Sequence, residues 1–472
     1  MRLMIAGGGG FRVPLVYRAL CSGPFAGLVD ELILYDVDAS RLVAIESVLA
    51  AMPVPEGSRP AVVVSTDLGQ ALAGTRMVFA AIRPGGTAGR MVDERVALDL
   101  GVLGQETTGA GGISYALRSI PRMLELAEAM RVHCPDAWLI NFTNPAGMVT
   151  EALVPVLGKR VIGICDSAGG LVKRAAAAAG TPLPDGRLDG VGYYGLNHLG
   201  WLYRLAPAGT DLLPGLLSSH DALASMEEGR LFGQHMLELL GCLPNEYLYY
   251  YYETHHATQA IRRQSETRGA SIHGQQAALY PGLAGSADAY ARWDAARLSR
   301  EEGYLAESRE EGEQRDESDL AGGGYERVAL AVMRALSGSS SGATELILNV
   351  PNSTVAPVAG VATVAPVAGV ATAKVAVPGL PADAVVEVPC QVTSDGALPL
   401  AQERPGGQFL TLMRHVKEVE RLTIQAVREG SRKAALQAFA AHPLVGSADL
   451  GRQLLEGYED SFPELAQLWV EH

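Results

Sequence analysis

Cysteine is scarce in this chain of 472 residues, and its positions show no pairing pattern. The five cysteines, an odd number, are widely scattered, at positions 21, 134, 165, 242 and 390. Because such scatter indicates no disulfide framework, we expect a reducing compartment, the cytoplasm. A thiolate can serve there as a metal ligand.

Long apolar segments are missing as well. No apolar run approaches the roughly 20 residues that a membrane-spanning helix needs. The first apolar stretch, residues 3–6, is too short for the hydrophobic region of a signal peptide and runs straight into glycines. The sequence therefore favours a chain with no membrane partner and no secretion signal.

Positive charge is in deficit. The chain has 38 lysines and arginines against 52 aspartates and glutamates, a net charge of −14, and no basic run. This balance argues against nucleic acid and anionic membranes as partners. An anionic substrate would need a local arginine pocket to hold it against the overall field. With 48% hydrophobic residues, the chain suits a large globular protein of two closely joined domains.

Glycine is concentrated at the start of the chain, between a predicted strand at residues 3–6 and a predicted helix at about 14–20. The run consists of Gly7, Gly8, Gly9 and Gly10. Glycine lets the backbone turn sharply and approach a pyrophosphate, while the first N–H groups of the helix point at the phosphates. This arrangement predicts a dinucleotide-binding βαβ unit, with a flexible turn as the alternative.

A second strand, predicted at residues 31–35, ends in Asp36. An acid at this place accepts hydrogen bonds from the ribose hydroxyls of adenosine. Its charge favours NAD over NADP, because a 2′-phosphate would meet a negative group. Arg12 stands where the usual glycine fingerprint has its third small residue.

Strands and helices then alternate through the first 185 residues. Further strands are predicted at 61–65, 76–82, 137–141 and 160–164. Helices are predicted at 68–73 and 113–134, the second kinked or split by Pro121. This alternation is typical of a parallel sheet, so we expect an NAD-binding Rossmann-type domain at 1–185.

The pattern changes after about residue 183, which places a second domain, for catalysis and oligomerisation, at 186–472. It contains predicted strands at 191–194 and 201–204, a charged helix at 301–317, a loop at 338–342 and helical structure over 414–441. The sequence VAPVAGVAT also occurs twice in tandem, over 355–372. We interpret this repeat as a duplication in a surface loop, with an interface or lid element as the alternative, since two copies are too few for a solenoid.

Side chains with useful chemistry follow the predicted strands. Asn144, Cys165 and Asp166 come after strands of the first domain, and Asn197 and His198 lie between strands of the second. Ligands bind at the carboxyl edge of open α/β sheets. A cysteine and a histidine are good ligands for a borderline transition metal, and a pair leaves room for substrate oxygens. A buried apolar cysteine and a structural histidine are the alternatives.

A series of motifs occurs in an order that resembles one enzyme family. The motifs are GGGGFRVP, RPGGTAGR, GQETTGAGG, NFTNPAGMVTEA, GICDSAGG, YYGLNHLGW, PNEYLYYYY and ERLTIQA…HPL. Together they resemble glycoside hydrolase family 4, whose members depend on NAD and a metal, and most of all its 6-phospho-β-glucosidase branch. The resemblance implies an α/β fold with a Rossmann-type parallel sheet and an α/β (α+β) C-terminal domain, as in the lactate/malate dehydrogenase-like glycosidases. It also implies NAD and Mn²⁺, or another divalent metal, as cofactors.

The chemistry that the resemblance implies differs from hydrolysis by two carboxylates. NAD⁺ takes a hydride from the sugar C3, and the resulting ketone, polarised by the metal, acidifies the C2 proton. A base removes that proton, the aglycone leaves, water adds, and the hydride returns without net redox change. The expected substrate is a 6-phospho-β-glucoside, such as phosphorylated cellobiose or an aryl glucoside.

The resemblance assigns catalytic and metal-binding roles residue by residue. Cys165 and His198 match the metal ligands. Tyr247 best matches the base, with Tyr250 and Tyr251 as fallbacks in the tyrosine run. A free tyrosine has a pKa near 10, so it needs a nearby cation to act as a base.

Binding roles and two further catalytic roles also follow from the resemblance. Glu106 matches the acid that raises the basicity of the tyrosine, with a loop-stabilising carboxylate as the alternative. Asp166 matches the proton donor of α-type members. Expected substrate contacts are Arg90, Asn144, Asn197 and Arg268. Expected cofactor contacts are Gly7, Gly8, Gly9, Gly10, Phe11, Arg12, Asp36, Arg83 and Asn144.

Two departures from the β-type pattern leave the anomeric specificity open. Asp166 stands where β-type members typically carry Asn in a CNVP motif. In the segment TRGAS, residues 267–271, alanine follows the glycine where a glutamate is usual. An α-glycosidase of the same family is therefore the alternative. An NAD-dependent 2-hydroxyacid dehydrogenase and a non-catalytic NAD sensor are more remote. A homodimer or homotetramer is expected, with the tyrosine run and the tandem repeat as candidate interfaces.

Overall fold

The first half of the chain builds a parallel sheet. The computed structural model describes residues 1–55, 59–302, 324–339, 342–353 and 375–470. Its parallel strands are β1 (Arg2–Ala6), β2 (Glu31–Tyr35), β3 (Ala61–Ser65), β4 (Met77–Ala80), β5 (Trp138–Asn141) and β6 (Val161–Gly163). They lie in the order β3-β2-β1-β4-β5-β6, which is the strand order of the Rossmann fold. The predicted fold class is confirmed.

Helices cross between these strands on both faces of the sheet. They are α1 (Val13–Cys21), α2 (Ala39–Ala51), α3 (Leu68–Leu72), α4 (Gly86–Asp99), α5 (Ala110–His133), α6 (Ala146–Leu157) and α7 (Ser167–Ala178). Successive side chains of a strand point to opposite faces. Leu3 and Ile5 of β1 accordingly belong to one buried core, and Met4 and Ala6 to another.

The second half of the chain extends the same sheet with antiparallel strands. They are β7 (Val191–Leu196), β8 (Leu199–Leu205), β9 (Leu243–Pro244), β10 (Thr344–Pro351), β11 (Val385–Thr393) and β12 (Gly396–Pro399). β10 pairs with β6 through Asn349 and Gly163, and β11 pairs with β10 and with β7. The described residues thus form one twelve-stranded sheet. The expected boundary at 185/186 falls between α7 and β7, inside this sheet, and the division into two domains stays a prediction.

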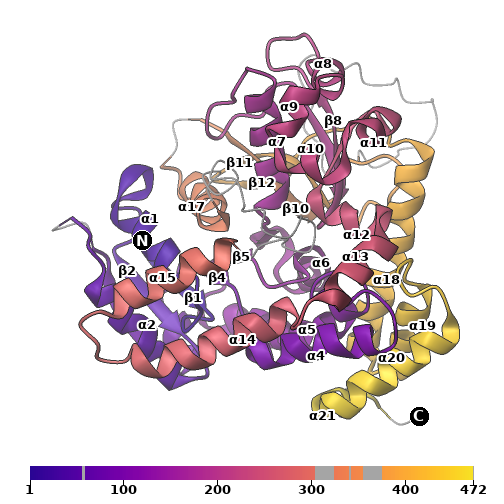
Figure 1. Cartoon of the computed structure of the whole chain (residues 1–472). Helices are drawn as coiled ribbons and strands as arrows, with labels where there is room; N and C mark the ends of the chain where they lie inside the picture. Colours follow the sequence, from indigo (N-terminus) through magenta and orange to yellow (C-terminus); the bar gives the residue numbers. More distant parts are fainter. Residues whose placement is uncertain (56–58, 303–323, 340–341, 354–374, 471–472) are drawn as a thin grey trace, which may run out of the picture.

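Helices of the second half lie against helices of the first (Figure 1). α14 (Arg268–Leu279) packs on α4, and α15 (Ala289–Glu302) packs on α2. The remaining helices of this half are α8 (Leu213–Leu217), α9 (His220–Ala224), α10 (Glu227–Phe232), α11 (Gln234–Leu240), α12 (Tyr249–Tyr252), α13 (Thr254–Arg263), α17 (Tyr325–Leu336), α18 (Gly407–Glu429), α19 (Arg432–Ala441), α20 (Ala448–Ser461) and α21 (Pro463–Ala466). This packing brings residues near 270–300 to the carboxyl edge of the parallel sheet.

Some local expectations are corrected by the structure. Pro121 lies inside α5, which is assigned as one helix from Ala110 to His133, so the chain is not split there. The helical structure expected over 414–441 consists of two helices, because Gly430 adopts φ +60° and ends α18. The tandem repeat at 355–372 lies outside the described residues, as does most of the helix expected at 301–317.

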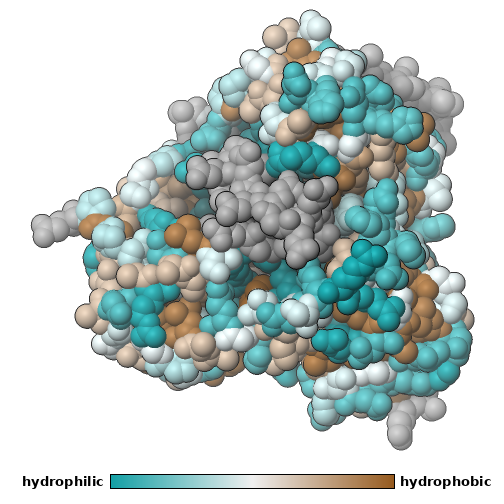
Figure 2. Space-filling model, in the orientation of Figure 1, coloured by the Kyte–Doolittle hydropathy of each residue, from teal (hydrophilic) through white to brown (hydrophobic). Residues whose placement is uncertain are grey.

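The molecular surface mixes hydrophilic and hydrophobic residues. Figure 2 shows hydrophilic residues over α13 and around the outward helices of this face. Among the residues that the structure describes, no helix has both the length and the apolar character required to cross a lipid bilayer.

Candidate functional site

The glycine run forms a turn that tolerates no side chain at two of its positions. Gly7 has φ +91°, and a Cβ there would lie 2.7 Å from the carbonyl oxygen of Ala81. A Cβ on Gly8 would lie 2.7 Å from the Cα of Leu34 in the neighbouring strand β2. Glycine is therefore required by close backbone packing. The turn leads directly into α1, as the predicted dinucleotide unit requires.

Asp36 is fixed beside this turn. Its Oδ2 accepts a hydrogen bond of 3.0 Å from the N–H of Gly9, and its Oδ1 accepts one of 3.1 Å from the N–H of Asp38. Carboxylate oxygens have further lone pairs, so Asp36 retains acceptor capacity for ribose hydroxyls. The donor set and the cradle of the turn fit a dinucleotide of the NAD type.

Three aromatic side chains from the second half of the chain hold the carbonyl groups of the turn. The Tyr280 hydroxyl donates to the carbonyl oxygen of Gly9 at 2.9 Å. Trp293 Nε1 donates to that of Phe11 at 2.7 Å, and the Tyr325 hydroxyl donates to that of Arg12 at 2.9 Å. We call these three residues the aromatic clamp. Phe11 itself is buried, with its ring centroid 5.9 Å from that of Trp293.

Cys165 and His198 meet although 33 residues separate them. Cys165 follows β6 and His198 occupies the turn between β7 and β8, and the distance from Sγ to Nε2 is 3.5 Å. Bond lengths of about 2.3 Å to sulfur and about 2.1 Å to nitrogen place two ligands of one tetrahedral ion roughly 3.6 Å apart. The pair therefore fits a single metal ion. His198 has φ +61°, a left-handed conformation that is rare outside glycine and often found at functional sites.

Burial pushes both members of the pair toward their neutral forms. It raises the pKa of the Cys165 thiol well above its ordinary value, and the carboxylates of Asp166 and Glu387 raise it further. It lowers the pKa of His198 to about 3, and the negative charge of Glu106 only partly opposes this shift. A neutral imidazole is the form that binds a metal. The thiol would ionise when a cation binds beside it.

Tyr247 stacks directly on His198. The two ring centroids are 3.7 Å apart and the rings are nearly parallel, at 6°. Two other hydroxyls of the run are used elsewhere, because Tyr249 bonds His256 Nδ1 at 2.8 Å and Tyr252 accepts from Trp201 Nε1 at 3.0 Å. Tyr247 is the residue of the run that stacks on His198. Its role as the base, with Tyr250 and Tyr251 as fallbacks, stays a prediction.

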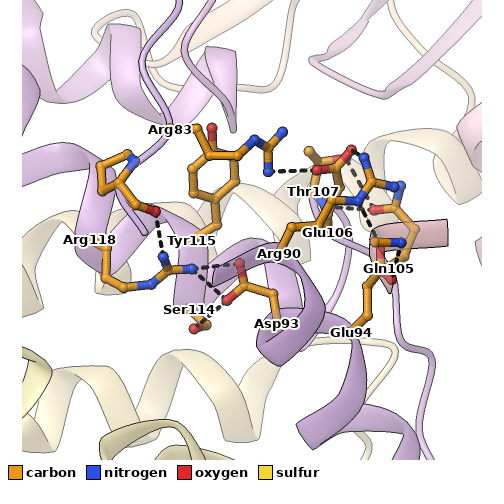
Figure 3. Close-up of polar contacts among 12 residues, drawn as sticks. Arg83, Arg90, Asp93, Glu94, Gln105, Glu106, Thr107, Ser114, Tyr115 and Arg118 are labelled. Atoms are coloured by element: carbon orange, nitrogen blue, oxygen red, sulfur yellow. Dashed lines mark hydrogen bonds and ion pairs between the residues drawn. The ribbon is translucent and has the colours of Figure 1, made fainter. Parts of the chain in front are cut away.

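Arg83 and Arg90 converge on Glu106 from two directions (Figure 3). Each forms an ion pair of 2.6 Å with one of its carboxylate oxygens. Burial alone would raise the pKa of Glu106, but Arg83, Arg90, Arg300 and Arg268 outweigh it and lower this pKa to about 2. Glu106 is therefore a fixed negative charge, and both arginines keep their positive charges.

A second ionic layer supports these arginines. Arg90 Nε also donates to Glu94 Oε1 at 2.8 Å, while Glu94 Oε2 accepts from the N–H of Gly269 at 2.8 Å. This links α4 to the start of α14, where Arg268 lies. Arg83 also lies over the ring of Tyr115, with its Cζ 4.6 Å from the centroid. The arginine positions are thus set by contacts that reach across both halves of the chain.

The two predicted asparagines hold the loop after β5. Both Asn144 Oδ1 and Asn197 Oδ1 accept from the N–H of Ala146, at 3.3 and 3.1 Å. Asn197 Nδ2 donates to Glu387 Oε1 at 3.3 Å. The amide of Asn197 is therefore engaged within the protein. Its role in substrate binding stays a prediction, as do the roles of Asn144 and Asp166.

Sequence reasoning missed several residues of this site. The aromatic clamp, Glu387 and Arg300 all come from the second half of the chain. Burial raises the pKa of Glu387 to about 7, against hydrogen bonds from Tyr193, Asn197 and Asn349 that lower it. No local sequence pattern predicts these residues, because a single tryptophan, tyrosine, glutamate or arginine outside a motif does not indicate a site.

Fold and site together define a class of protein: an α/β protein with a glycine turn of the dinucleotide-binding type and a buried cysteine–histidine pair that fits a metal ion. Comparison with protein families narrows this class. The model of the family 4 glycosyl hydrolases matches residues 2–181, and that of the family 4 glycosyl hydrolase C-terminal domain matches residues 193–445. The chain belongs to glycosyl hydrolase family 4.

Curated relatives carry both anomeric names. A 6-phospho-beta-glucosidase of Thermotoga maritima is 26% identical over 470 residues, 99% of this chain and 100% of that protein. A maltose-6′-phosphate glucosidase of Bacillus subtilis is 27% identical over 492 residues, 98% of this chain and 97% of that protein. A 6-phospho-alpha-glucosidase of Lacticaseibacillus paracasei is 36% identical over 216 residues, 45% of this chain and 48% of that protein.

Solved structures agree over the full length. The Thermotoga maritima 6-phospho-beta-glucosidase, solved with NAD and glucose-6-phosphate, has a TM-score of 0.77 and 25% identity, covering 98% of this chain and 99% of that one. The same enzyme solved with manganese, NAD⁺ and glucose-6-phosphate gives the same TM-score, identity and coverage.

Proposed function

We propose that this glycosidase hydrolyses 6-phosphoglucosides and that 6-phospho-β-glucosides are its substrates. The observation that carries the proposal is the Cys165–His198 pair, 3.5 Å apart, with Tyr247 stacked on its imidazole. A metal ion held by Cys165 and His198 would polarise a sugar carbonyl, and a phenol beside it could remove the proton from the neighbouring carbon. The relatives named for phosphorylated glucosides support the substrate class.

NAD and Mn²⁺ are the cofactors. When bound, NAD⁺ would accept a hydride from the sugar reversibly, and Mn²⁺ would polarise the carbonyl oxygen of the oxidised sugar. The glycine turn and Asp36 hold the dinucleotide, and Cys165 and His198 hold the metal ion. Contacts of Phe11, Arg12, Arg83 and Asn144 with NAD belong to the same proposal.

The remaining residues bind substrate and move protons. Tyr247 would accept the proton from C2, helped by the charge of a metal ion held by Cys165 and His198. Asp166, next to Cys165, gives a proton to the leaving oxygen. Arg90 and Arg268 hold the phosphate, because a guanidinium presents a planar fork to it. Glu106 fixes Arg83 and Arg90 and so sets the position of the phosphate relative to Tyr247.

Hydrolysis of 6-phospho-α-glucosides is the second candidate. Asp166 favours it, because this carboxylate is close enough to Cys165 and Glu387 to raise the pKa of both. The relative with 36% identity over part of the chain also carries the alpha name. A homodimer or homotetramer in the cytoplasm stays our expectation.

The test uses p-nitrophenyl 6-phosphoglucosides of both anomers and their unphosphorylated counterparts, with NAD⁺ and Mn²⁺ under reducing conditions. We expect release of p-nitrophenol from the phosphorylated β-anomer with catalytic NAD⁺ and no net NADH. Cleavage of only the phosphorylated α-anomer would replace the β assignment. NADH that accumulates in proportion to substrate would instead identify a dehydrogenase.

A further inference from the structure

Arg300 is a cation with no described anionic partner. It lies in the last turn of α15, and its Cζ is 5.0 Å from the centroid of the Phe11 ring. Its Nε is inaccessible to solvent and has no hydrogen-bond partner within the part of the chain that the structure describes. Among the described residues, no carboxylate lies within ion-pair distance of its guanidinium. Arg300 is half-buried, and a partly buried guanidinium without such a partner favours binding of an anion.

The surroundings of Arg300 increase the need for an anion. Burial lowers its pKa, and the positive charges of Arg12, Arg90 and Arg268 lower it further, with only Glu106 in opposition. Glu106 already pairs with Arg83 and Arg90. Glu94 also pairs with Arg90. Among the described residues, neither carboxylate forms an ion pair with Arg300.

A cavity of about 360 Å³ opens beside this cation. It is lined by Gln264, Ser265, Glu266, Thr267, Arg268, Ser271, Ile272, Gln275, Ser299 and Arg300. The lining is rich in hydroxyl and amide groups, which donate hydrogen bonds to phosphate oxygens. Arg268 is tied to Arg300, since its NH2 group donates to the Arg300 carbonyl oxygen at 3.2 Å. Two arginines from different helices thus line one polar cavity.

We propose that Arg300 binds the phosphate of the substrate together with Arg268, as a residue that determines the requirement for a phosphorylated sugar. The proposal rests on the proposed function for the identity of the sugar. A phosphate group could also belong to the dinucleotide, because Arg300 lies over Phe11 of the glycine turn. Arg268, which the family resemblance assigns to the substrate, lines the same cavity as Arg300, and this shared lining favours the sugar phosphate.

The test measures binding with Arg300→Gln, which removes the charge but keeps an amide donor. Glucose 6-phosphate, inorganic phosphate, glucose and NAD⁺ are the probes, titrated by calorimetry against the full-length protein. Loss of a charge-assisted contact predicts a Kd for glucose 6-phosphate raised by about 10- to 100-fold. The Kd for NAD⁺ should change less than about threefold. Arg300→Lys should recover part of the loss.

The matched control is Arg292→Gln on the same helix, because Arg292 is exposed and its guanidinium donates to the Gly282 carbonyl oxygen. It should leave every Kd unchanged, and circular dichroism should show the same melting temperature for all variants within a few degrees. An unchanged Kd for glucose 6-phosphate in Arg300→Gln would overturn the proposal. So would a raised Kd for NAD⁺ alone, which would assign Arg300 to the dinucleotide.

Failure of the proposed function would look different. The wild-type protein would then bind inorganic phosphate but neither bind glucose 6-phosphate nor cleave its aryl glucosides. A Kd for inorganic phosphate raised in Arg300→Gln would still establish the anion site in that case. An unchanged Kd for inorganic phosphate would remove the site as well.

Discussion

Two clusters of this site differ in charge: the Cys165–His198 pair is neutral, whereas Glu106 and its arginines are ionised. The Cys165–His198 pair is driven toward neutrality, with the pKa of the thiol raised and that of the imidazole lowered to about 3. Glu106 is comparably enclosed, yet its pKa is lowered to about 2, because Arg83 and Arg90 pair with it. Burial therefore decides charge only where partners are missing. The first cluster is arranged for a cation and the second, with its arginines, for an anion.

Removing the phenol beside the first cluster should have the largest effect. Tyr247→Phe keeps the ring stacked on His198 but removes the proton acceptor, so turnover should fall by about 10²- to 10⁴-fold. Steady-state kinetics on the aryl 6-phosphoglucoside would measure it. The control is Tyr252→Phe, whose hydroxyl contacts Trp201 and whose loss should change turnover less than about threefold. Equal loss in both variants would contradict the role of Tyr247.

Removing Cys165, the proposed metal ligand, breaks the first cluster directly. Cys165→Ala should weaken Mn²⁺ binding by more than the roughly 10- to 100-fold that loss of a supporting residue costs. Titration of free Mn²⁺ by electron paramagnetic resonance would measure the Kd. Cys134→Ala, at another buried cysteine, should leave this Kd unchanged. If Cys165→Ala binds Mn²⁺ as tightly as the wild type, the pair is not the metal site.

Neutralising Glu106 tests the second cluster. Glu106→Gln leaves the half-buried Arg83 without its carboxylate and the buried Arg90 with Glu94 alone. The protein should therefore lose roughly 3 kcal/mol of stability at neutral pH. The folded-state pKa lies below the ordinary value of 4.5. The contribution is thus fully present above pH 4.5 and is lost as the pH falls toward 2.

Urea denaturation at several pH values would measure this difference. The gap between wild type and Glu106→Gln should be constant from pH 7 to 5 and narrow below 4.5. Glu125→Gln, which breaks the exposed Arg122–Glu125 pair, should cost less than about 1 kcal/mol at any pH. A gap that stays constant down to pH 3 would mean that Glu106 is not held ionised by its arginines.

The smallest expected effect concerns the aromatic clamp, which carries no charge. Trp293→Phe removes the donor to the Phe11 carbonyl oxygen, a hydrogen bond of 2.7 Å. Loss of about 1 kcal/mol in positioning the turn should raise the Kd for NAD⁺ about fivefold. Fluorescence titration would measure it, with Trp469→Phe, whose donor contacts Glu459, as the control. Equal affinities of Trp293→Phe and the wild type would show that the clamp does not orient the turn.

The sequence predicted the parallel sheet well because its signals are local. The strand ending before Asp36 and the strand at 61–65 were placed residue for residue. The glycine turn was predicted because a run of glycines between a strand and a helix is typical of a dinucleotide-binding unit. The antiparallel strands β10 to β12 were not expected, since their pairing partners lie far along the chain. Only tertiary packing joins them to β6 and β7.

The site was predicted in part for the same reason. Cys165 and His198 were paired through family motifs, and the structure brings them to 3.5 Å. Arg300, Trp293 and Tyr325 were missed, because what distinguishes them is a contact with the glycine turn made by folding of the second half. Glu106 was assigned through the resemblance as the acid that raises the basicity of the tyrosine, with a loop-stabilising carboxylate as the alternative. Its two arginine partners became visible in the fold.

The most direct measurement of the central claim is hydrolysis of the aryl 6-phosphoglucoside in D₂O with NAD⁺ and Mn²⁺. If Tyr247 removes the C2 proton before the aglycone leaves, nuclear magnetic resonance of the released glucose 6-phosphate will show deuterium at C2. Hydrolysis that leaves C2 fully protonated would contradict the account, because the bond would then break by direct displacement.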